Sequence, residues 1–174
     1  MIQNTTLNKI AILGITGSGK STVSRRIAEK TRLSLFHMDA LFWKSGWTEV
    51  PETEYIRGQA EILKNNPRWI IEGWINSKLV ERIRQADLIV YLDYSGLRAA
   101  LRYAWRAVKY RKVARPELPP DCVDTFKLRR FLIILFRGER REIEEALTMA
   151  HVESKVVRLA SPSEMEQYLQ TFNA

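Results

Sequence analysis

The sequence has a single cysteine and no long apolar run, and its first residues do not resemble a signal peptide. Cys122 on its own excludes an internal disulfide framework and suits a reducing compartment. The longest apolar run, Phe131 to Phe136, is far shorter than a membrane span. Because the segment MIQNTTLNK lacks the apolar core of a secretion signal, we expect a cytoplasmic protein without a membrane partner.

Several signatures of other protein classes are also missing. We find no helix-turn-helix pattern, no cluster of zinc ligands and no nucleic-acid-binding aromatic motif. A G-x-G-x-x-G dinucleotide fingerprint and internal repeats are absent as well. The apolar and charged fractions, 45% and 28%, are ordinary for a globular protein. We therefore expect one domain over residues 1–174, large enough to bury a proper core.

Positive charge is concentrated in one stretch of the chain. The net charge is +8, and residues 98–141 hold 13 Lys or Arg against 4 Asp or Glu, whereas the rest of the chain holds 15 against 16. Arginine predominates in this stretch, which suits fork-like recognition of phosphate groups. On DNA, such a stretch predicts weak binding without sequence preference.

The segment GITGSGKST, from Gly14 to Thr22, carries the clearest functional signal. It follows the apolar run Lys9 to Leu13 and opens a helical stretch, the context in which G-x-x-x-x-G-K-[ST] binds nucleotide phosphates. A glycine-rich turn before a helix is the alternative, although every fixed position of the motif is filled. The motif predicts a site for ATP and Mg²⁺ formed by Gly14, Thr16, Gly17, Ser18, Gly19, Lys20, Ser21 and Thr22.

Three residues of this loop have separate predicted roles. Lys20 would reach the β- and γ-phosphates, and the hydroxyl of Ser21 would bind Mg²⁺. Thr22 could add a hydroxyl and a backbone N–H at the α-phosphate. The glycines would let successive backbone N–H groups surround a phosphate.

Strand-like and helix-like segments alternate along the rest of the chain. Strands are expected at Lys9–Leu13, Leu33–Phe36, Arg68–Glu72, Asp87–Asp93 and Lys155–Leu159. Helices are expected from Ser21, at 52–64, 77–85, 96–112 and 125–151, the last bent near Gly138, and from Pro162. This alternation predicts an α/β fold of three layers, with a parallel sheet covered by helices on both faces. The proline-rich segment 113–124, between two long helices, is predicted to be a lid.

Acidic side chains end three of the predicted strands. Either Glu72 or Asp93 could be the carboxylate that supports Mg²⁺. We favour Glu72 because Gly73 behind it permits close approach of a ligand. The alternative is that either acid caps the next helix. Asp39 could accept a proton from a substrate hydroxyl or help to hold Mg²⁺. His37 points the same way along its strand and could touch the substrate, although a lone histidine there also fits a structural hydrogen bond.

Aromatic residues and arginines complete the candidate site. Trp43 and Trp74 could wall an acceptor pocket, or they could form a small core beneath a loop. Arg102 belongs to an i, i+4 stripe on one helix and is a candidate for substrate binding. Arg111 and Arg115, in and beside the lid, are candidates for the arginines that stabilise a transferring phosphoryl group.

The chain resembles the bacterial DNA topology modulation proteins, P-loop kinases related to adenylate kinase. The likeness rests on the phosphate loop, on the stretch FHMDALFWKSGW, on RWIIEG and on ADLIVYLD, and it covers nearly the whole chain. It implies five strands in the order 2-3-1-4-5, an adenylate-kinase-like core and a short lid with arginines. Family members usually have Asp at the position of Glu72 and Asn at that of Trp74.

Two hypotheses follow for the function. The first is an ATP-dependent kinase that phosphorylates a small acceptor, with a nucleotide among the candidates, and that works as a monomer or homodimer. The second is an ATP-binding regulator that uses the basic region 98–141 on DNA. We favour the kinase because the stripe from Arg98 to Arg106 covers only about two helical turns, which is short for a DNA footprint.

Overall fold

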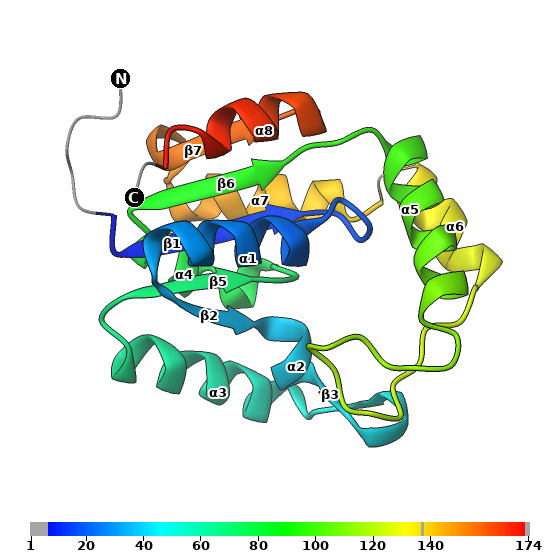
Figure 1. Cartoon of the computed structure of the whole chain (residues 1–174). Coiled ribbons are helices and arrows are strands. Elements are labelled where there is room, and N and C mark those ends of the chain that lie inside the picture. Colours follow the sequence, from blue (N-terminus) through cyan, green and yellow to red (C-terminus); the bar gives the residue numbers. More distant parts are fainter. Residues whose placement is uncertain (1–6, 137, 173–174) are drawn as a thin grey trace.

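A five-stranded parallel sheet forms the centre of the structure (Figure 1). The structure is a computed structural model, and it describes residues 7–136 and 138–172. The strands are β1 (Lys9–Gly14), β2 (Ser34–His37), β5 (Trp69–Glu72), β6 (Leu88–Leu92) and β7 (Val156–Leu159), in the order β2-β5-β1-β6-β7. This is the predicted order of the five strands. Their labels differ only because a small antiparallel hairpin, β3 (Trp43–Lys44) and β4 (Thr48–Glu49), lies between β2 and β5 in the sequence.

Helices cover both faces of the sheet, as predicted for an α/β fold. Side chains of α1 and α8 pack on the face formed by Ile10, Ile12 and Ile70. Side chains of α3, α4 and α7 pack on the opposite face, against Ala11 and Leu13. The helices are α1 (Lys20–Thr31), α2 (Met38–Phe42), α3 (Glu52–Asn65), α4 (Glu81–Gln85), α5 (Gly96–Lys109), α6 (Leu128–Leu135), α7 (Arg140–Ala150) and α8 (Pro162–Leu169). Short 3₁₀ turns occur at Ser45–Trp47, Ser77–Leu79 and Glu153–Lys155.

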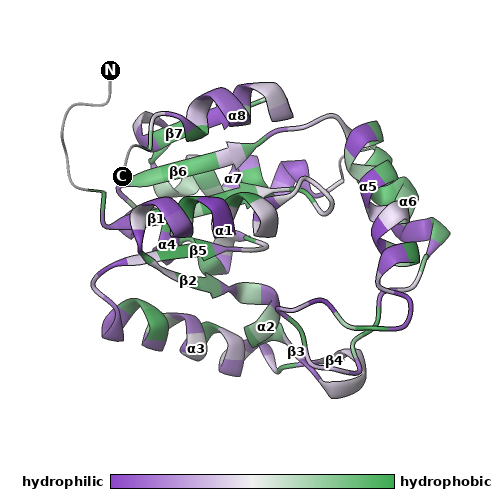
Figure 2. Cartoon of the chain, viewed as in Figure 1, coloured by the Kyte–Doolittle hydropathy of each residue, from purple (hydrophilic) through white to green (hydrophobic). Residues whose placement is uncertain are grey.

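The central strands are apolar along their whole length because they are buried from both sides. Ile10, Ile12 and Leu13 of β1 are inaccessible to solvent, as are Ile70 and Ile71 of β5. Such uninterrupted apolar runs are typical of parallel strands between two helix layers. Figure 2 shows the apolar colour concentrated in β1, β5 and β6. This buried sheet fixes the positions of the loops at its carboxyl edge.

The predicted helix over 125–151 is wrong. The chain instead forms two helices, α6 and α7, separated by a turn in which the N–H of Gly138 donates to the carbonyl of Ile133 at 2.9 Å. Glycine has low helix propensity, so a continuous helix is costly at this point. The break places the start of α7 beside the phosphate loop, which a continuous helix would not do.

Two other predicted helices are shorter than expected. The helix expected over 96–112 ends at Lys109, and the one expected over 77–85 is a 3₁₀ turn followed by α4. The side chain of Asn76 accepts a hydrogen bond from the N–H of Lys78 and so caps that turn. None of the helices in the described part of the chain is both long and apolar enough to span a membrane.

Candidate active site

A cleft of about 1240 Å³ lies over the carboxyl ends of the central strands. The phosphate loop, the segment from Asp39 to Glu49, the inner side of α5, the segment 113–124 and the junction of α6 and α7 all line it. Ligands of open parallel sheets bind at this edge, because the loops that leave the strands converge there. The cleft therefore brings together residues from most of the predicted site.

The segment from Gly14 to Lys20 forms the turn that the motif predicts between β1 and α1. Gly17 and Gly19 have φ angles of 82° and 97°, a region that side chains other than glycine rarely adopt. A Cβ on Gly17 would also lie 2.2 Å from the carbonyl oxygen of Ala99 on α5, so this position has no room for another residue. The loop is thus held open in a form that exposes backbone N–H groups at the start of α1.

The cation of the loop is Lys20, whose Nζ donates to the carbonyl oxygens of Gly14 and Ile15 at 2.8 and 3.2 Å. Arg102 of α5 lies against the same loop, since its guanidinium would be 2.9 Å from a Cβ placed on Gly19. Two cations therefore flank the exposed backbone N–H groups, an arrangement suited to a polyphosphate.

Glu72 connects the phosphate loop to the neighbouring strand. The hydroxyl of Ser21 donates to its Oε1 at 3.0 Å, and Nδ1 of His37 lies 2.6 Å from the same oxygen. His37 and Glu72 are register partners on β2 and β5, so their side chains point the same way. Burial to 2% exposure would by itself raise the pKa of Glu72, but the hydrogen bond from His37 and the charge of Lys20 hold the pKa below its ordinary value. Glu72 is thus an anionic oxygen donor beside the loop hydroxyl.

Asp93, the other candidate for the carboxylate that supports Mg²⁺, lies in a different environment from Glu72. Its Oδ2 pairs with Arg140 at 3.0 Å and with Arg158 at 3.1 Å, and its side chain is 11% exposed. These partners belong to α7 and β7. The structure therefore ties Asp93 to the packing of α7 against the sheet edge, whereas Glu72 contacts the loop.

Asp39, in the first turn of α2, lines the cleft. Its side chain is 40% exposed, and Oδ2 lies 3.7 Å from Nη1 of Arg115. Partial desolvation is the largest effect on the pKa of Asp39, and together with the charge of Glu72 it raises this pKa above its usual range. The charges of Lys20 and Arg115 oppose the shift. Asp39 is a carboxylate with an increased affinity for protons.

Arg115 is the centre of a charged cluster next to Asp39. Its side chain is 8% exposed and lies 3.4 Å from Glu117 and 3.2 Å from Asp124. Arg106 of α5 pairs with Asp124 at 3.3 Å, and Arg25 of α1 pairs with Glu117 at 2.5 Å. The segment 113–124 is thus joined to α1, α2 and α5 by ion pairs. Three arginines face three carboxylates, which leaves this half of the cleft close to neutral.

Aromatic side chains form the wall between the charged cluster and the hairpin. Trp43 packs edge-on against Trp47 with ring centroids 5.1 Å apart, and Trp47 donates from Nε1 to the carbonyl of Val123 at 2.9 Å. Trp74 lines the cleft from the β5 side and donates from Nε1 to Glu142 at 2.8 Å. The aromatic rings therefore serve both as a wall and as an anchor for the segment 113–124.

Three of the predicted site residues, Ser18, His37 and Arg111, are not among the residues that line the cleft. Arg111 is exposed in the turn after α5. Thr16, Ser18 and Thr22 are in the loop as predicted. Ser18 is fully buried, and its N–H donates to the carbonyl of Ile15 at 3.1 Å, so it supports the turn.

Neither a protein-family model nor a curated protein sequence matches the chain. Solved structures do match it. Shikimate kinase from Acinetobacter baumannii, in complex with shikimate, has a TM-score of 0.57 at 14% identity over 95% of this chain and 90% of that one. A gluconokinase from Sinorhizobium meliloti 1021 has a TM-score of 0.56 at 16% identity, over 96% of this chain and 90% of its own. A sugar kinase from Janibacter sp. HTCC2649 has a TM-score of 0.54 at 14% identity, over 97% of this chain and 99% of its own.

The chain has the P-loop kinase fold. At these identities the likeness concerns the fold alone. The resemblance to the DNA topology modulation proteins rests on sequence motifs and stays a prediction.

Within this P-loop kinase fold, Arg130 and Glu139 are site residues that the sequence analysis missed. Both line the cleft, and both contact Thr16 of the phosphate loop. The sequence does hold a signal for Glu139, because it is the one acidic residue between Lys127 and Arg141, in an otherwise basic stretch. The acids Glu117 and Asp124 carry no comparable signal, since only the fold reveals that they meet Arg115.

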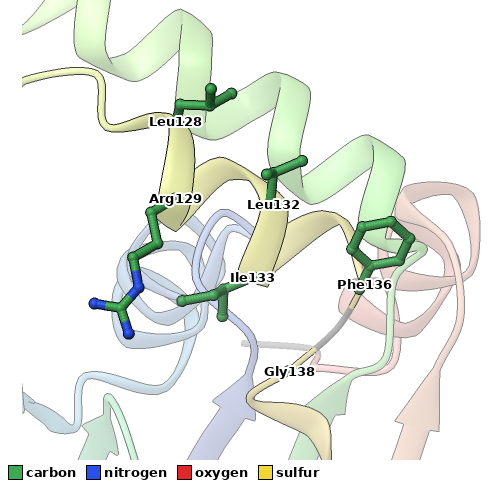
Figure 3. Close-up of a pocket in the computed structure, with 6 residues that line it drawn as sticks. All are labelled: Leu128, Arg129, Leu132, Ile133, Phe136 and Gly138. Carbon is green, nitrogen blue, oxygen red and sulfur yellow. The ribbon is translucent and has the colours of Figure 1, made fainter.

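A second, apolar hollow of about 530 Å³ lies along α6 and shares Arg129, Ile133 and Gly138 with the cleft (Figure 3). Leu128, Leu132 and Phe136 line it, and Phe136 is 78% exposed. The neighbouring helix α5 also exposes Leu97, Leu101, Trp105 and Val108. An apolar face therefore covers the outer side of both helices, while their inner sides face the cleft.

Proposed function

We propose that the chain is a P-loop kinase that transfers the γ-phosphoryl group of ATP to a hydroxyl of a small acceptor. One observation carries this proposal: the loop hydroxyl of Ser21, the buried anion Glu72 and the proton-accepting Asp39 converge in one cleft beside exposed loop amides. The kinase fold of the three solved structures is consistent with it. We further propose that the chain forms a single domain in which 113–124 is the lid.

The residues at the loop fit a triphosphate and a hard divalent cation. Loop N–H groups, Lys20 and Arg102 would hold the phosphates, and Ser21 with Glu72 would hold Mg²⁺. These are oxygen ligands, and Mg²⁺ commonly takes only one or two from the protein and the others from phosphate and water. In agreement, no group of three or more His, Cys, Asp or Glu able to cage a metal occurs among the described residues. When bound, Mg²⁺ would neutralise phosphate charge.

The transfer needs a base near the acceptor hydroxyl, and Asp39 is placed for that role. The acceptor oxygen forms a bond to the γ-phosphorus, the bond from that phosphorus to the ADP oxygen breaks, and the hydroxyl proton passes to Asp39. The raised pKa of Asp39 favours this proton transfer at neutral pH. The products are ADP and a phosphate monoester of the acceptor.

The acceptor half of the cleft favours an uncharged molecule with several hydroxyl groups. Arg25, Arg106 and Arg115 are each paired with a carboxylate, so they are poorly available for a second phosphate on the acceptor. Carboxylates and aromatic faces are what polyhydroxylated compounds bind. The structural neighbours named as sugar kinase, gluconokinase and shikimate kinase support the several hydroxyl groups, although gluconate and shikimate also carry a carboxylate.

The DNA-regulator hypothesis has no support in the structure. Arg102 and Arg106 of the predicted stripe turn into the cleft, where Arg102 meets the phosphate loop and Arg106 pairs with Asp124. A DNA-binding surface would present such cations along an exposed face.

A panel of sugars, polyols, nucleosides and nucleotides, assayed for acceptor-dependent ADP release, tests the proposal. We expect turnover with a polyhydroxylated acceptor and none in a folded Lys20→Ala variant, because this variant lacks the cation at the phosphates. Turnover that survives intact in Lys20→Ala would overturn the assignment, as would failure of the wild-type protein to bind ATP with Mg²⁺.

A further inference from the structure

The carboxylate of Glu139 lies on the backbone of the phosphate loop. Its Oε2 accepts the N–H of Thr16 at 2.5 Å, and its Oε1 accepts the hydroxyl of Thr16 at 2.9 Å. Arg130 pairs with Oε1 of the same carboxylate and donates to the hydroxyl of Thr16 at 2.9 Å. The side chain of Glu139 is only 11% exposed. Glu139, which directly precedes α7, and Arg130 of α6 thus close over one end of the loop.

In this contact, the phosphate loop binds the carboxylate of Glu139 in the way that its backbone is expected to bind a phosphate. Successive N–H groups in such a turn form an anion-binding concavity. The carboxylate of Glu139 is bound by an N–H donor and a guanidinium, which are the same groups that bind a phosphate oxygen. Glu139 therefore occupies an anion position of the loop with an anion from the chain itself.

The place of Thr16 in the loop indicates which phosphate would compete for it. Thr22 and the start of α1 lie at one end of the motif, where the α-phosphate is expected, and Thr16 lies at the other end. The N–H of Thr16 would thus meet the terminal phosphate of a triphosphate. A diphosphate, one group shorter, would not reach it.

We propose that Glu139 makes the site sensitive to the terminal phosphate of the nucleotide, an inference that rests on the proposed function. ATP must displace the carboxylate of Glu139 from Thr16, and the guanidinium of Arg130 then pairs with the γ-phosphate instead of with Glu139. When ADP is bound, Glu139 and Arg130 stay paired with each other. Arg130 engages the nucleotide only when a transferable phosphate is present, and it returns to Glu139 after transfer.

Glu139 therefore lowers the affinity for ATP relative to ADP. The variant Glu139→Gln keeps the shape of the side chain but removes its charge, so it should bind ATP on the order of tenfold more tightly, the equivalent of one lost charge-assisted hydrogen bond. Its affinity for ADP should stay within about twofold, since the contact to ADP does not involve Thr16. The ratio of the two affinities is the quantity to follow, because a purely structural role would change both alike.

Isothermal titration of ATP and ADP, each with Mg²⁺ and without acceptor, measures this ratio. Glu145→Gln is the matched control, because it removes one charge from the same helix, where Glu145 pairs with Arg141 at 3.2 Å on the surface. Glu139→Asp keeps the charge but shortens the side chain by one methylene. It should shift the ratio in the same direction as Glu139→Gln, and it decides the question if the Gln variant does not fold.

An unchanged ATP-to-ADP ratio in folded Glu139→Gln or Glu139→Asp overturns the inference while leaving the kinase proposal intact. Weaker binding of ATP by these variants overturns it as well. Should the wild-type protein bind neither nucleotide, the proposed function and this inference fail together. A ratio that shifts toward ATP in the Glu139 variants and not in Glu145→Gln supports the proposal.

Discussion

Asp39, the proposed base, is a residue whose ionised form is needed for the proposed activity but is disfavoured by the fold. Partial desolvation and the charge of Glu72 raise its pKa, which means that the folded protein disfavours its ionised form. In the unfolded chain the carboxyl titrates at its ordinary pKa of about 3.9. As pH rises above that value, ionisation stabilises the unfolded chain more than the folded one. The cost therefore grows as pH rises from that value to the raised pKa of the folded protein, and it disappears in acid.

The variant Asp39→Asn should accordingly be more stable and less active. We expect kcat to fall by about 10² to 10⁴, the usual contribution of a general base. The melting temperature at neutral pH should rise, and the gain should vanish below about pH 3, where the wild-type carboxyl is protonated in both the folded and the unfolded chain. Thermal unfolding measured at both pH values checks this sign. A lower melting temperature of the variant at neutral pH would show that the pairing of Asp39 with Arg115 outweighs its desolvation.

Glu72 and Asp93 offer a second comparison at the residue scale. Glu72→Gln should reduce Mg²⁺-dependent turnover by orders of magnitude, because it removes the anion beside Ser21. Asp93→Asn should leave turnover near that of the wild type and lower the melting temperature, since it weakens two arginine pairs that hold α7 and β7. Kinetics over a Mg²⁺ series, together with melting curves, separate the two effects. If Asp93→Asn loses more activity than Glu72→Gln, the metal carboxylate is misassigned.

At the scale of single elements, the segment 113–124 is docked on the β3–β4 hairpin. Trp47 donates to the carbonyl of Val123, the thiol of Cys122 lies 3.4 Å from the carbonyl oxygen of Lys44, and Ser45 contacts Asp121. Only the Ser45–Asp121 bond is exposed, whereas the other two are part-buried. If 113–124 is the proposed lid, its opening must also break the ion pairs of Glu117 with Arg25 and of Asp124 with Arg106, so the open form is a local opening with a free-energy cost.

Hydrogen exchange should detect this detachment. Without ligand we expect fast exchange over 113–124, and slower exchange when a bisubstrate analogue bridges the lid and the phosphate loop. Trp47→Phe keeps the aromatic wall but removes the N–H donor to Val123, so it should speed exchange in the free protein. Equal protection with and without the analogue would contradict a lid.

The five strands and the phosphate loop could be predicted because their signals are local. An uninterrupted apolar run such as Ile10–Leu13 can only be a buried strand or a buried helix segment, and the glycine motif that follows decides between the two. The hairpin at Trp43–Glu49 was missed because strands of two residues leave no period to detect. A bend was expected near Gly138, but the full break between α6 and α7 was not, because the apolar pattern continues at helical spacing.

The contacts of Glu139, Glu117 and Asp124 could not be predicted for a different reason. Each depends on tertiary packing that joins segments distant in the sequence, and Glu139 and Thr16 are separated by 123 positions. Pairing rules for charges apply within an element, at i, i+3 or i, i+4, and they do not extend across a fold. The same limit explains why the roles of Arg111 and Arg115 could not be told apart before their surroundings were known.

At the scale of the whole molecule, seven of the thirteen Lys and Arg residues in the basic stretch 98–141 line the cleft. We therefore expect DNA binding to be weak, independent of sequence and rapidly lost as salt rises, because few phosphates can be neutralised at once. Fluorescence anisotropy with unrelated duplexes across a salt series measures this. Tight binding to one duplex at physiological salt, without phosphorylation of any small acceptor, would favour the DNA hypothesis over the kinase.

The position of β1 at the middle of the sheet has a consequence for the order of folding. Lys9 of β1 pairs with Trp69 and Ile10 with Leu88, so the partners of the first strand are made roughly 60 and 80 residues later. Contacts of such long sequence separation form slowly, since loop closure must precede them. During synthesis the GITGSGKST segment would leave the ribosome long before the strands that hold it in shape. Nucleotide binding would thus begin only once β5 and β6 have joined β1, which makes it a late event in the maturation of this chain.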